Sequence, residues 1–149
     1  MKYNQSYNGK DFSGYLTYLE IIKNKLPQDL YNFVRDVNRH NFEKTSLHDS
    51  WLKEFKVKTD FEKRLSIIHL VLLGSYHDRE FHLLFEDVEQ YTLNQGLRDM
   101  SRDLITFEVG IEKNCYNEEQ IVFRAYFSME EEIEIYCNNI KIEEVIKRG

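Results

Sequence analysis

The chain has a single proline and only six glycines among its 149 residues. Flexible linkers depend on these residue types, so their scarcity leaves no segment that would separate two domains. The length fits one domain and suffices for a buried core. We therefore expect a single folded domain over residues 1–149.

Cysteine is also scarce. Cys115 and Cys137 are too few for the disulfide framework of a small secreted domain, and they do not form a CxxC pair. We interpret them as two reduced thiols. A single bridge between neighbouring strands is the alternative.

Long hydrophobic runs are missing too. The longest, "IIHLVLLG" at 67–74, is far shorter than the roughly 20 residues that span a bilayer. The polar start "MKYNQSYNGKDF" lacks the apolar region of a signal peptide. We expect a protein without a membrane segment, located in the cytoplasm.

Basic residues are in the minority at one end of the chain. The net charge is −6; residues 1–102 carry 15 acidic and 15 basic side chains, whereas the last 47 carry 11 and 5. Nucleic acid binding requires Lys and Arg to replace the counterions of phosphates. The charge therefore argues against a nucleic acid partner and is compatible with a basic protein partner.

What the sequence does contain begins with two helical patterns. Apolar residues recur at helical spacing in "SGYLTYLEIIKNK" at 13–25. After Pro27, which suits the first turn of a helix, a second stripe appears in "PQDLYNFVRDVNRH". Its members, at i, i+3, i+4 and i+7, are Leu30, Phe33, Val34 and Val37. We predict a pair of helices within about residues 12–42.

From Trp51 onward the period of the pattern changes to two. In "REFHLLFEDV", Phe81, Leu83 and Phe85 alternate with polar residues, as in a strand with one buried face. Other segments predicted as strands are 51–57, 64–74, 103–111, 120–127 and 132–137, while the tail 140–147 fits a last strand or a short helix. The sheet part is expected at about 50–146.

The breaks between these segments are short, which favours hairpins and a mostly antiparallel sheet. They lie at 74–78, 94–96, 114–117, 128–131 and 138–139. Helices followed by strands are typical of the α+β class. We predict an α+β fold in which an N-terminal helical pair packs on a twisted sheet of five to seven strands.

Two His-Asp pairs are the candidate chemical groups. "SLHDSW" places His48 and Asp49 between the helical and sheet parts, and "SYHDRE" places His77 and Asp78 in a predicted turn, with His82 just beyond. An aspartate can hold one imidazole tautomer and leave the other nitrogen as a base. Adjacent strand residues point to opposite faces, so contact within a pair requires a turn. A small metal-dependent enzyme or ligand-binding protein is one hypothesis; polar residues at element ends are the other.

Motifs that would support catalysis are absent from the sequence. It contains no HExxH, GxSxG or GxxxxGK[ST] pattern and no paired CxxC. We expect no cofactor, no metal ion and no catalytic residue. His69, inside the most apolar strand, is expected to be a buried neutral histidine.

The stretch "SMEEEIEIYCNN" forms a candidate binding surface. Its acidic cluster consists of Glu130, Glu131, Glu132 and Glu134. Such a patch can steer a basic partner toward the protein. Charges on an exposed strand also discourage unwanted pairing with other chains, which is the structural alternative.

The order of segments resembles that of a known group of proteins. A helical "YLEIIKNKLPQDLYNFV", then "LHDSWL", an apolar strand, hairpins and a closing "EEIEIYCNNIKIEEV" are similar to small bacterial proteins of unknown function, some grouped with the immunity proteins of polymorphic toxin systems. The resemblance implies no catalytic residues. It implies a protein that binds and blocks a toxin, and an acidic face suits a basic nuclease toxin.

We therefore predict a non-catalytic protein-binding module, with an immunity-type inhibitor as its specific form. The metal-dependent or ligand-binding protein is the first alternative. A homo-oligomeric structural module that pairs through an exposed sheet edge is the second.

Overall fold

The computed structural model describes residues 1–94 and 103–147. Its two α-helices are α1 (Ser13–Ile22) and α2 (Gln28–Arg35). The strands are β1 (Trp51–Asp60), β2 (Leu65–Leu73), β3 (Arg79–Val88), β4 (Gln90–Asn94), β5 (Leu104–Lys113), β6 (Glu119–Phe127), β7 (Glu131–Cys137) and β8 (Asn139–Ile146). Helices come first and strands follow, so the predicted α+β class is confirmed. No helix in the described ranges is long and apolar enough to cross a membrane.

The strands form two antiparallel sheets of four, in the orders β1-β2-β3-β8 and β4-β7-β6-β5. This differs from the predicted single sheet of five to seven strands. Two segments, 79–94 and 131–146, each bend and contribute one strand to each sheet. On the first segment Asp87 adopts a left-handed conformation, with φ of 53°, next to the bend.

Pairing between the two bent segments continues across the kink. Glu86 pairs with Asn139 on one side and Gln90 with Tyr136 on the other. In between, Asn138 N–H donates to Glu86 O at 3.0 Å and Glu89 N–H to Tyr136 O at 3.4 Å. The hairpin predicted at 138–139 is therefore wrong, because the chain continues along the same partner. The break predicted at 94–96 extends beyond the described residues.

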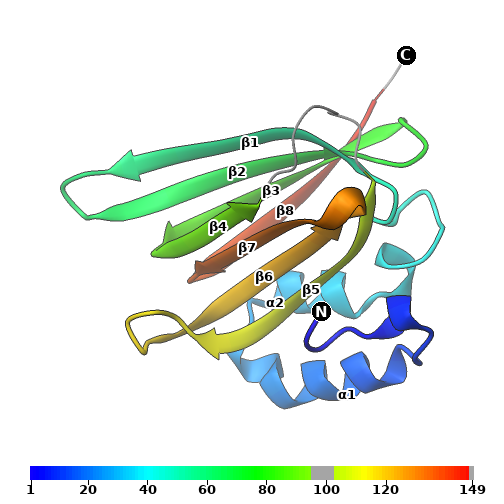
Figure 1. Cartoon of the computed structure of the whole chain (residues 1–149), viewed down its shortest axis with the longest axis horizontal. Coiled ribbons are helices and arrows are strands. Elements are labelled where there is room, and N and C mark those ends of the chain that lie inside the picture. Colours follow the sequence, from blue (N-terminus) through cyan, green and yellow to red (C-terminus); the bar gives the residue numbers. More distant parts are fainter. Residues whose placement is uncertain (95–102, 148–149) are drawn as a thin grey trace.

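The helices lie on one side of the strands, and the β1–β2 hairpin projects beyond them (Figure 1). α1 packs against β5 and α2 against β8. Every second residue of these strands packs against the helices, as the alternating sequence pattern predicted. The fully buried large side chains of this core include Tyr15, Leu19, Leu30, Phe81, Phe85, Phe107, Phe123 and Phe127.

The predicted pattern is wrong at two positions, Ile105 and Val37. In the segment 103–111, alternation after an offset at Leu104 predicts that Ile105 shares the face of Phe107 and Val109. A bulge between Leu104 and Thr106 shifts the start of β5, so that Leu104 is buried in the core whereas Ile105 is partly exposed. In addition, α2 ends at Arg35 because Asp36 takes extended dihedral angles. Val37, the expected fourth member of the stripe, is consequently 48% exposed.

The N-terminal segment covers the outer face of β5. The fully buried carboxylate of Glu108 accepts hydrogen bonds from Tyr3 N–H at 2.8 Å and Asn4 N–H at 3.0 Å. The Tyr3 ring occupies the space above Gly110, where an added Cβ would lie only 2.5 Å from it. At β5, the sheet β4-β7-β6-β5 is thus covered on both faces.

Tyrosine hydroxyl groups of α1 close the free edge of β5. Tyr15 Oη donates to Val109 O at 2.8 Å and accepts from Val109 N–H at 2.7 Å, and Tyr18 Oη accepts from Ile111 N–H at 3.0 Å. The backbone groups that an edge strand would otherwise offer to another chain are therefore satisfied by the helix.

Tyr15→Phe is expected to lower the free energy of unfolding by about 1–3 kcal/mol, because it leaves two buried backbone groups of Val109 unpaired. Urea unfolding measures this change. Tyr116→Phe is the matched control, since Tyr116 is 66% exposed; its effect is expected to be below about 0.5 kcal/mol. Equal effects of the two variants would contradict the role of Tyr15.

His40 links the N-terminal segment, α2 and β5 as a neutral ring. Its Nε2–H donates to Val34 O at 2.8 Å, its Nδ1 accepts from Asn4 Nδ2 at 3.3 Å, and the ring stacks on Phe107. Burial lowers the pKa of His40 from 6.5 to about 4, although the bond to Val34 acts in the opposite direction.

Between pH 6.5 and 4 the unfolded chain binds a proton at His40 that the folded protein does not bind. The resulting stability is fully present above pH 6.5 and is lost as the pH falls toward 4, by at most about 3 kcal/mol. Urea unfolding of the wild type and of His40→Gln from pH 7.5 to 4.5 measures it. The variant is expected to lose stability less steeply, and parallel curves would contradict the prediction.

Candidate functional site

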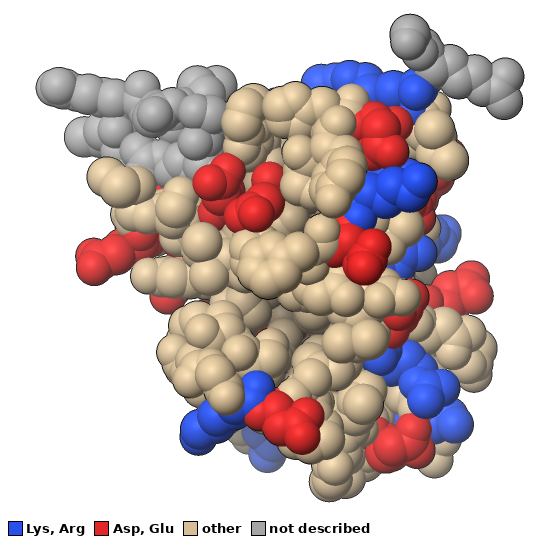
Figure 2. Space-filling view, turned by 90° about the vertical axis from the view of Figure 1, so that its right-hand side faces the viewer, with Lys and Arg blue, Asp and Glu red and all other residues tan. Residues whose placement is uncertain are grey.

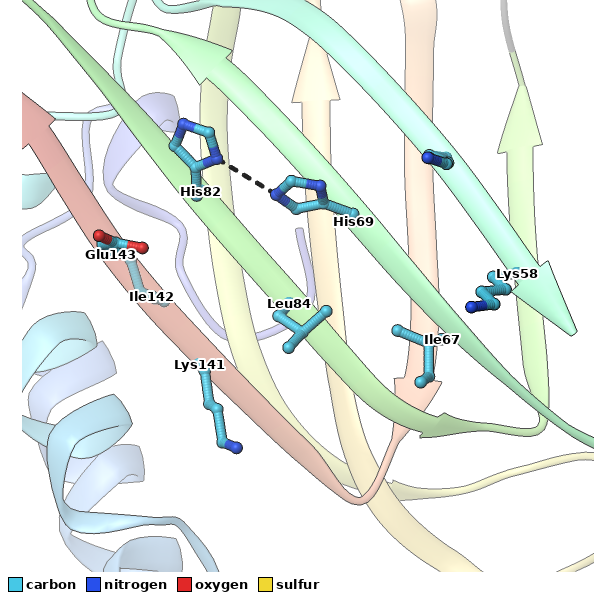
Figure 3. Close-up of a pocket in the computed structure, with 9 residues that line it drawn as sticks. Lys58, Ile67, His69, His82, Leu84, Lys141, Ile142 and Glu143 are labelled. Carbon is cyan, nitrogen blue, oxygen red and sulfur yellow. Dashed lines mark hydrogen bonds between the residues drawn. The ribbon is translucent and has the colours of Figure 1, made fainter. Parts of the chain in front are cut away.

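The outer face of the sheet β1-β2-β3-β8 carries an open groove of about 550 Å³ (Figure 3). The described residues that line it all come from these four strands, and the helices lie on the other side (Figure 1). They are Lys56, Lys58, Ile67, His69, His82, Leu84, Lys141, Ile142 and Glu143.

The strand register places the charged residues of this face in two parallel rows. One row, read across the four strands, is Lys56, His69, Leu84 and Lys141. The adjacent row is Glu54, Val71, His82 and Glu143. Directly opposite side chains in such rows lie about 5 Å apart at Cβ. A basic row therefore borders an acidic one, with one histidine in each.

The two histidines and a glutamate form a chain of hydrogen bonds. His69 Nε2 lies 3.2 Å from His82 Nδ1, and His82 Nε2 lies 3.2 Å from Glu80 Oε1. Figure 3 shows the two rings pointing toward one another across β2 and β3. His69 is partly exposed on the outer face, so the prediction of a buried histidine is wrong; the buried face of β2 carries Ile68, Leu70 and Leu72.

Glu80 is held ionised at the end of this chain. The Lys53 ammonium donates to it and lowers the pKa of the carboxyl to about 2. Bonds from His82 and Lys147 act in the same direction, whereas burial opposes them. A carboxylate can only accept hydrogen bonds. His82 Nε2 must therefore carry the hydrogen that points toward Glu80.

The Nε2–H group of His82 fixes the tautomers of both His69 and His82 when the two rings are neutral. When His82 is neutral with hydrogen on Nε2, its Nδ1 is an acceptor. His69 Nε2 must then donate to it, which leaves Nδ1 of His69 as an unprotonated nitrogen. In Figure 3 this second ring nitrogen lies on the side of His69 away from His82. A carboxylate that orients an imidazole is the arrangement that was predicted for the His-Asp pairs, but here Glu80 provides it.

The lysines of the groove differ in their partners. Lys141 Nζ lies 3.2 Å from Glu86 Oε1. Lys56 and Lys58 are exposed, and within the described residues neither has an ion pair. These two ammonium groups on β1 are therefore free to meet an anionic group.

His48 and Asp49 contact one another at the junction before β1. Asp49 has φ of 63°, and this turn brings its Oδ1 to 3.0 Å from His48 Nδ1. Contact within a His-Asp pair was expected to require a turn, and the turn at Asp49 provides it. His48 lines a separate cavity of about 360 Å³ together with His40 and Phe42.

His77 and Asp78 have structural partners. The His77 ring packs on Trp51, with ring centres 4.6 Å apart. Trp51 is not a core residue: it is partly exposed and donates to Asp103 Oδ1 at 2.7 Å. Asp78 accepts from Arg79 at 2.9 Å, and this bond lowers the pKa of its carboxyl.

Arg79 extends this contact into an ion network. It also donates to Glu144, which accepts from Arg39 at 2.9 Å. Burial raises the pKa of Glu144, but the bonds from both arginines outweigh it and lower the pKa overall. The network ties the segment after α2 to β3 and β8 and leaves Asp78 no free role as a base.

His48, His77 and His82 thus lie in three different environments, and only His82 joins the groove. In residues 1–94 and 103–147, no three His, Cys, Asp or Glu side chains are arranged to hold a metal ion.

The predicted acidic cluster is only partly exposed. Glu130 and Glu132 are exposed, whereas Glu131 is 8% exposed. Glu134 accepts from Arg124 Nε at 2.7 Å, and Arg124 also binds Glu108 and Glu112. On the side of the molecule shown in Figure 2, acidic and basic side chains likewise lie next to one another.

Both cysteines are free thiols. Cys137 is buried on β7, and burial raises the pKa of its thiol to about 12. Cys115 is exposed in the turn between β5 and β6.

The sequence analysis missed Lys56, Lys58, His69 and Lys141 as groove residues. A signal was present, because the turn at 74–78 and a period of two place Leu73 opposite Glu80 and His69 opposite Leu84. That register makes His69 and His82 diagonal neighbours on one face. The pairing of Lys141 through β8 was not readable, since the tail could equally have formed a helix.

A comparison of the chain with models of protein families and with curated proteins found no match.

We predict that above pH 8 both His69 and His82 carry their hydrogen on Nε2, because Glu80 accepts at the end of the chain. Long-range ¹H–¹⁵N NMR spectra of the rings identify the tautomers. His40 is the internal reference, since its Nε2–H donates to Val34 O. A hydrogen on Nδ1 of His69 under these conditions would contradict the assignment.

Proposed function

We propose that this protein is a non-catalytic module that binds another protein through the outer face of the sheet β1-β2-β3-β8. The observation that carries the proposal is the open groove on this face, with an apolar floor and two lysines that have no ion pair with any residue that the structure describes. A partner would place apolar side chains on Ile67 and Leu84 and acidic ones against Lys56 and Lys58. Apolar contact with a charged rim is typical of protein interfaces.

Several observations support binding over catalysis. The groove is an open surface, whereas catalytic sites exclude water to strengthen electrostatic interactions. Its described lining contains no Ser, Thr or Cys that the histidine pair could activate as a nucleophile. The hydrogen-bonded series Glu80–His82–His69 is therefore suited to binding a polar group of a partner.

The acidic pair Glu130 and Glu132 remains a second candidate contact for a basic partner. Both carboxylates are exposed beside the start of β7. Such charges mainly accelerate association. Blocking of a toxin, which the resemblance in segment order implies, would be one use of a module with these surfaces.

Affinity capture from a lysate of the source organism, with quantitative mass spectrometry, tests the proposal. A partner is expected on the wild type and is expected to be reduced at least about tenfold by the double variant Lys56→Glu/Lys58→Glu, because charge reversal opposes an acidic surface. Glu130→Lys/Glu132→Lys tests the second surface in the same way.

Lys10→Glu is the matched control, since Lys10 is exposed and does not line the groove. It is expected to retain the partner. Light scattering of the free protein identifies a second copy of the chain as the partner. Failure to find any protein whose retention depends on either surface would overturn the proposal.

A further inference from the structure

We propose that the groove is a binding site for an oxyanion, a carboxylate or phosphate group, held between Nδ1 of His69 and the ammonium groups of Lys56 and Lys58, with uptake of one proton. The inference deepens the proposed function, since it names the chemical group that a partner would present. Titration with free anions tests the oxyanion site independently of any protein partner, so that either proposal can fail without the other.

The proton uptake follows from the hydrogen bonds of the histidine pair. In the neutral pair, Nδ1 of His69 is unprotonated and repels an oxyanion lone pair. A proton added directly to His69 turns Nδ1 into an N–H donor. A proton added to His82 makes its Nδ1 a donor to His69 Nε2, so the hydrogen of His69 must move to Nδ1.

The result is therefore the same whether the extra proton is added to His69 or to His82. Nδ1 of His69 becomes a donor, and the pair becomes cationic. This result depends on Glu80, which accepts from His82 at 3.2 Å in every case. The pair acts as a unit because its members are linked by hydrogen bonds, so the proton belongs to the pair.

The lysines supply the remaining charge. Lys56 is directly opposite His69 on β1, and Lys58 is opposite Ile67, so both ammonium groups stand over the same side of the groove. Lys141 completes the row on β8, but Glu86 already neutralises it. An oxyanion at His69 thus meets two unpaired cations and one N–H donor.

Charged side chains from β1, β3 and β8 surround the histidine pair. The charged groups beside the pair are Glu54, Lys56 and Lys58 from β1, Glu80 and Glu86 from β3, and Lys141 and Glu143 from β8. Lys53 and Lys147 bind Glu80 and so add two cations at the His82 end. Glu80 and Glu143 lie next to His82, and Lys56 lies opposite His69. The negative charge of a bound anion attracts the added proton, and so anion and proton bind together.

Isothermal titration calorimetry with sulfate and with acetate tests the inference at constant ionic strength. Both probes keep their charge between pH 6 and 8, and they represent the tetrahedral and the carboxylate form of the ligand. Binding is expected to be at least about tenfold tighter at pH 6 than at pH 8, because the bound form carries more protons than the free form and affinity therefore rises as the pH falls. Buffers of different ionisation enthalpy are expected to show net proton uptake of between about one half and one proton over this range. The tighter probe identifies the source of the oxyanion.

Single variants separate the contribution of His69 to anion binding from that of Lys56. His69→Gln is expected to remove the pH dependence and the proton uptake, whereas Lys56→Met is expected to weaken binding about fivefold at both pH values and keep the uptake. His77→Asn and Lys10→Met are matched controls outside the groove and should behave as the wild type. Urea midpoints confirm that each variant is folded.

Absence of binding by both anions, or pH-independent binding without proton uptake, would overturn the inference. If anions bind as expected but no protein partner depends on Lys56 and Lys58, the inference stands and the proposed function fails. If a partner depends on these lysines but is indifferent to pH and to His69→Gln, the inference alone fails.

Discussion

The structure depends on an antiparallel ladder that bends without ending. The segments 79–94 and 131–146 stay paired through their kinks, where Asn138 N–H and Glu89 N–H carry the hydrogen bonds from one sheet to the next. Each sheet adds two further strands to this ladder. The inner side of the bend then collects apolar residues from both sheets, and the two short helices suffice to cover it. These two hydrogen bonds keep the paired segments together through the bend, which is why the two sheets can share one core.

The two sheets differ in what covers their outer faces. On β5 the N-terminal segment is fixed by the buried carboxylate of Glu108, and the edge is closed by Tyr15 and Tyr18. The outer face of β1-β2-β3-β8 carries instead an open groove lined by charged and apolar side chains. Exposed apolar surface that is rimmed by polar residues is typical of interaction sites. The groove is therefore the surface on which both a protein partner and an oxyanion site are proposed, and the proposed proton dependence rests on the hydrogen bonds from His69 through His82 to Glu80.

The sequence predicted the fold class and most of the core because these follow from local periodicity. The alternation of Phe81, Leu83 and Phe85 and the helical stripe of Leu30 and Val34 needed no knowledge of neighbours. The errors lie where geometry interrupts the period. The bulge at Leu104 exchanges the buried and partly exposed positions only at the start of β5, whereas Phe107 and Val109 remain in the core. The bends at Asp87 and Asn138 turn one predicted sheet into two. Of the predicted chemical residues, His48 and Asp49 do meet, while His77 and Asp78 are engaged by Trp51 and Arg79.

By itself, the sequence determined that this chain forms helices first and strands afterwards, and which residues of each strand are apolar, because both properties act over a few residues. The tertiary structure alone decided that His69 and His82 join Glu80, that Lys56 and Lys58 have no carboxylate partner among residues 1–94 and 103–147, and that Arg124 neutralises Glu134. These outcomes depend on the register between strands far apart in the chain. A shift of one residue would have turned every one of these side chains to the opposite face.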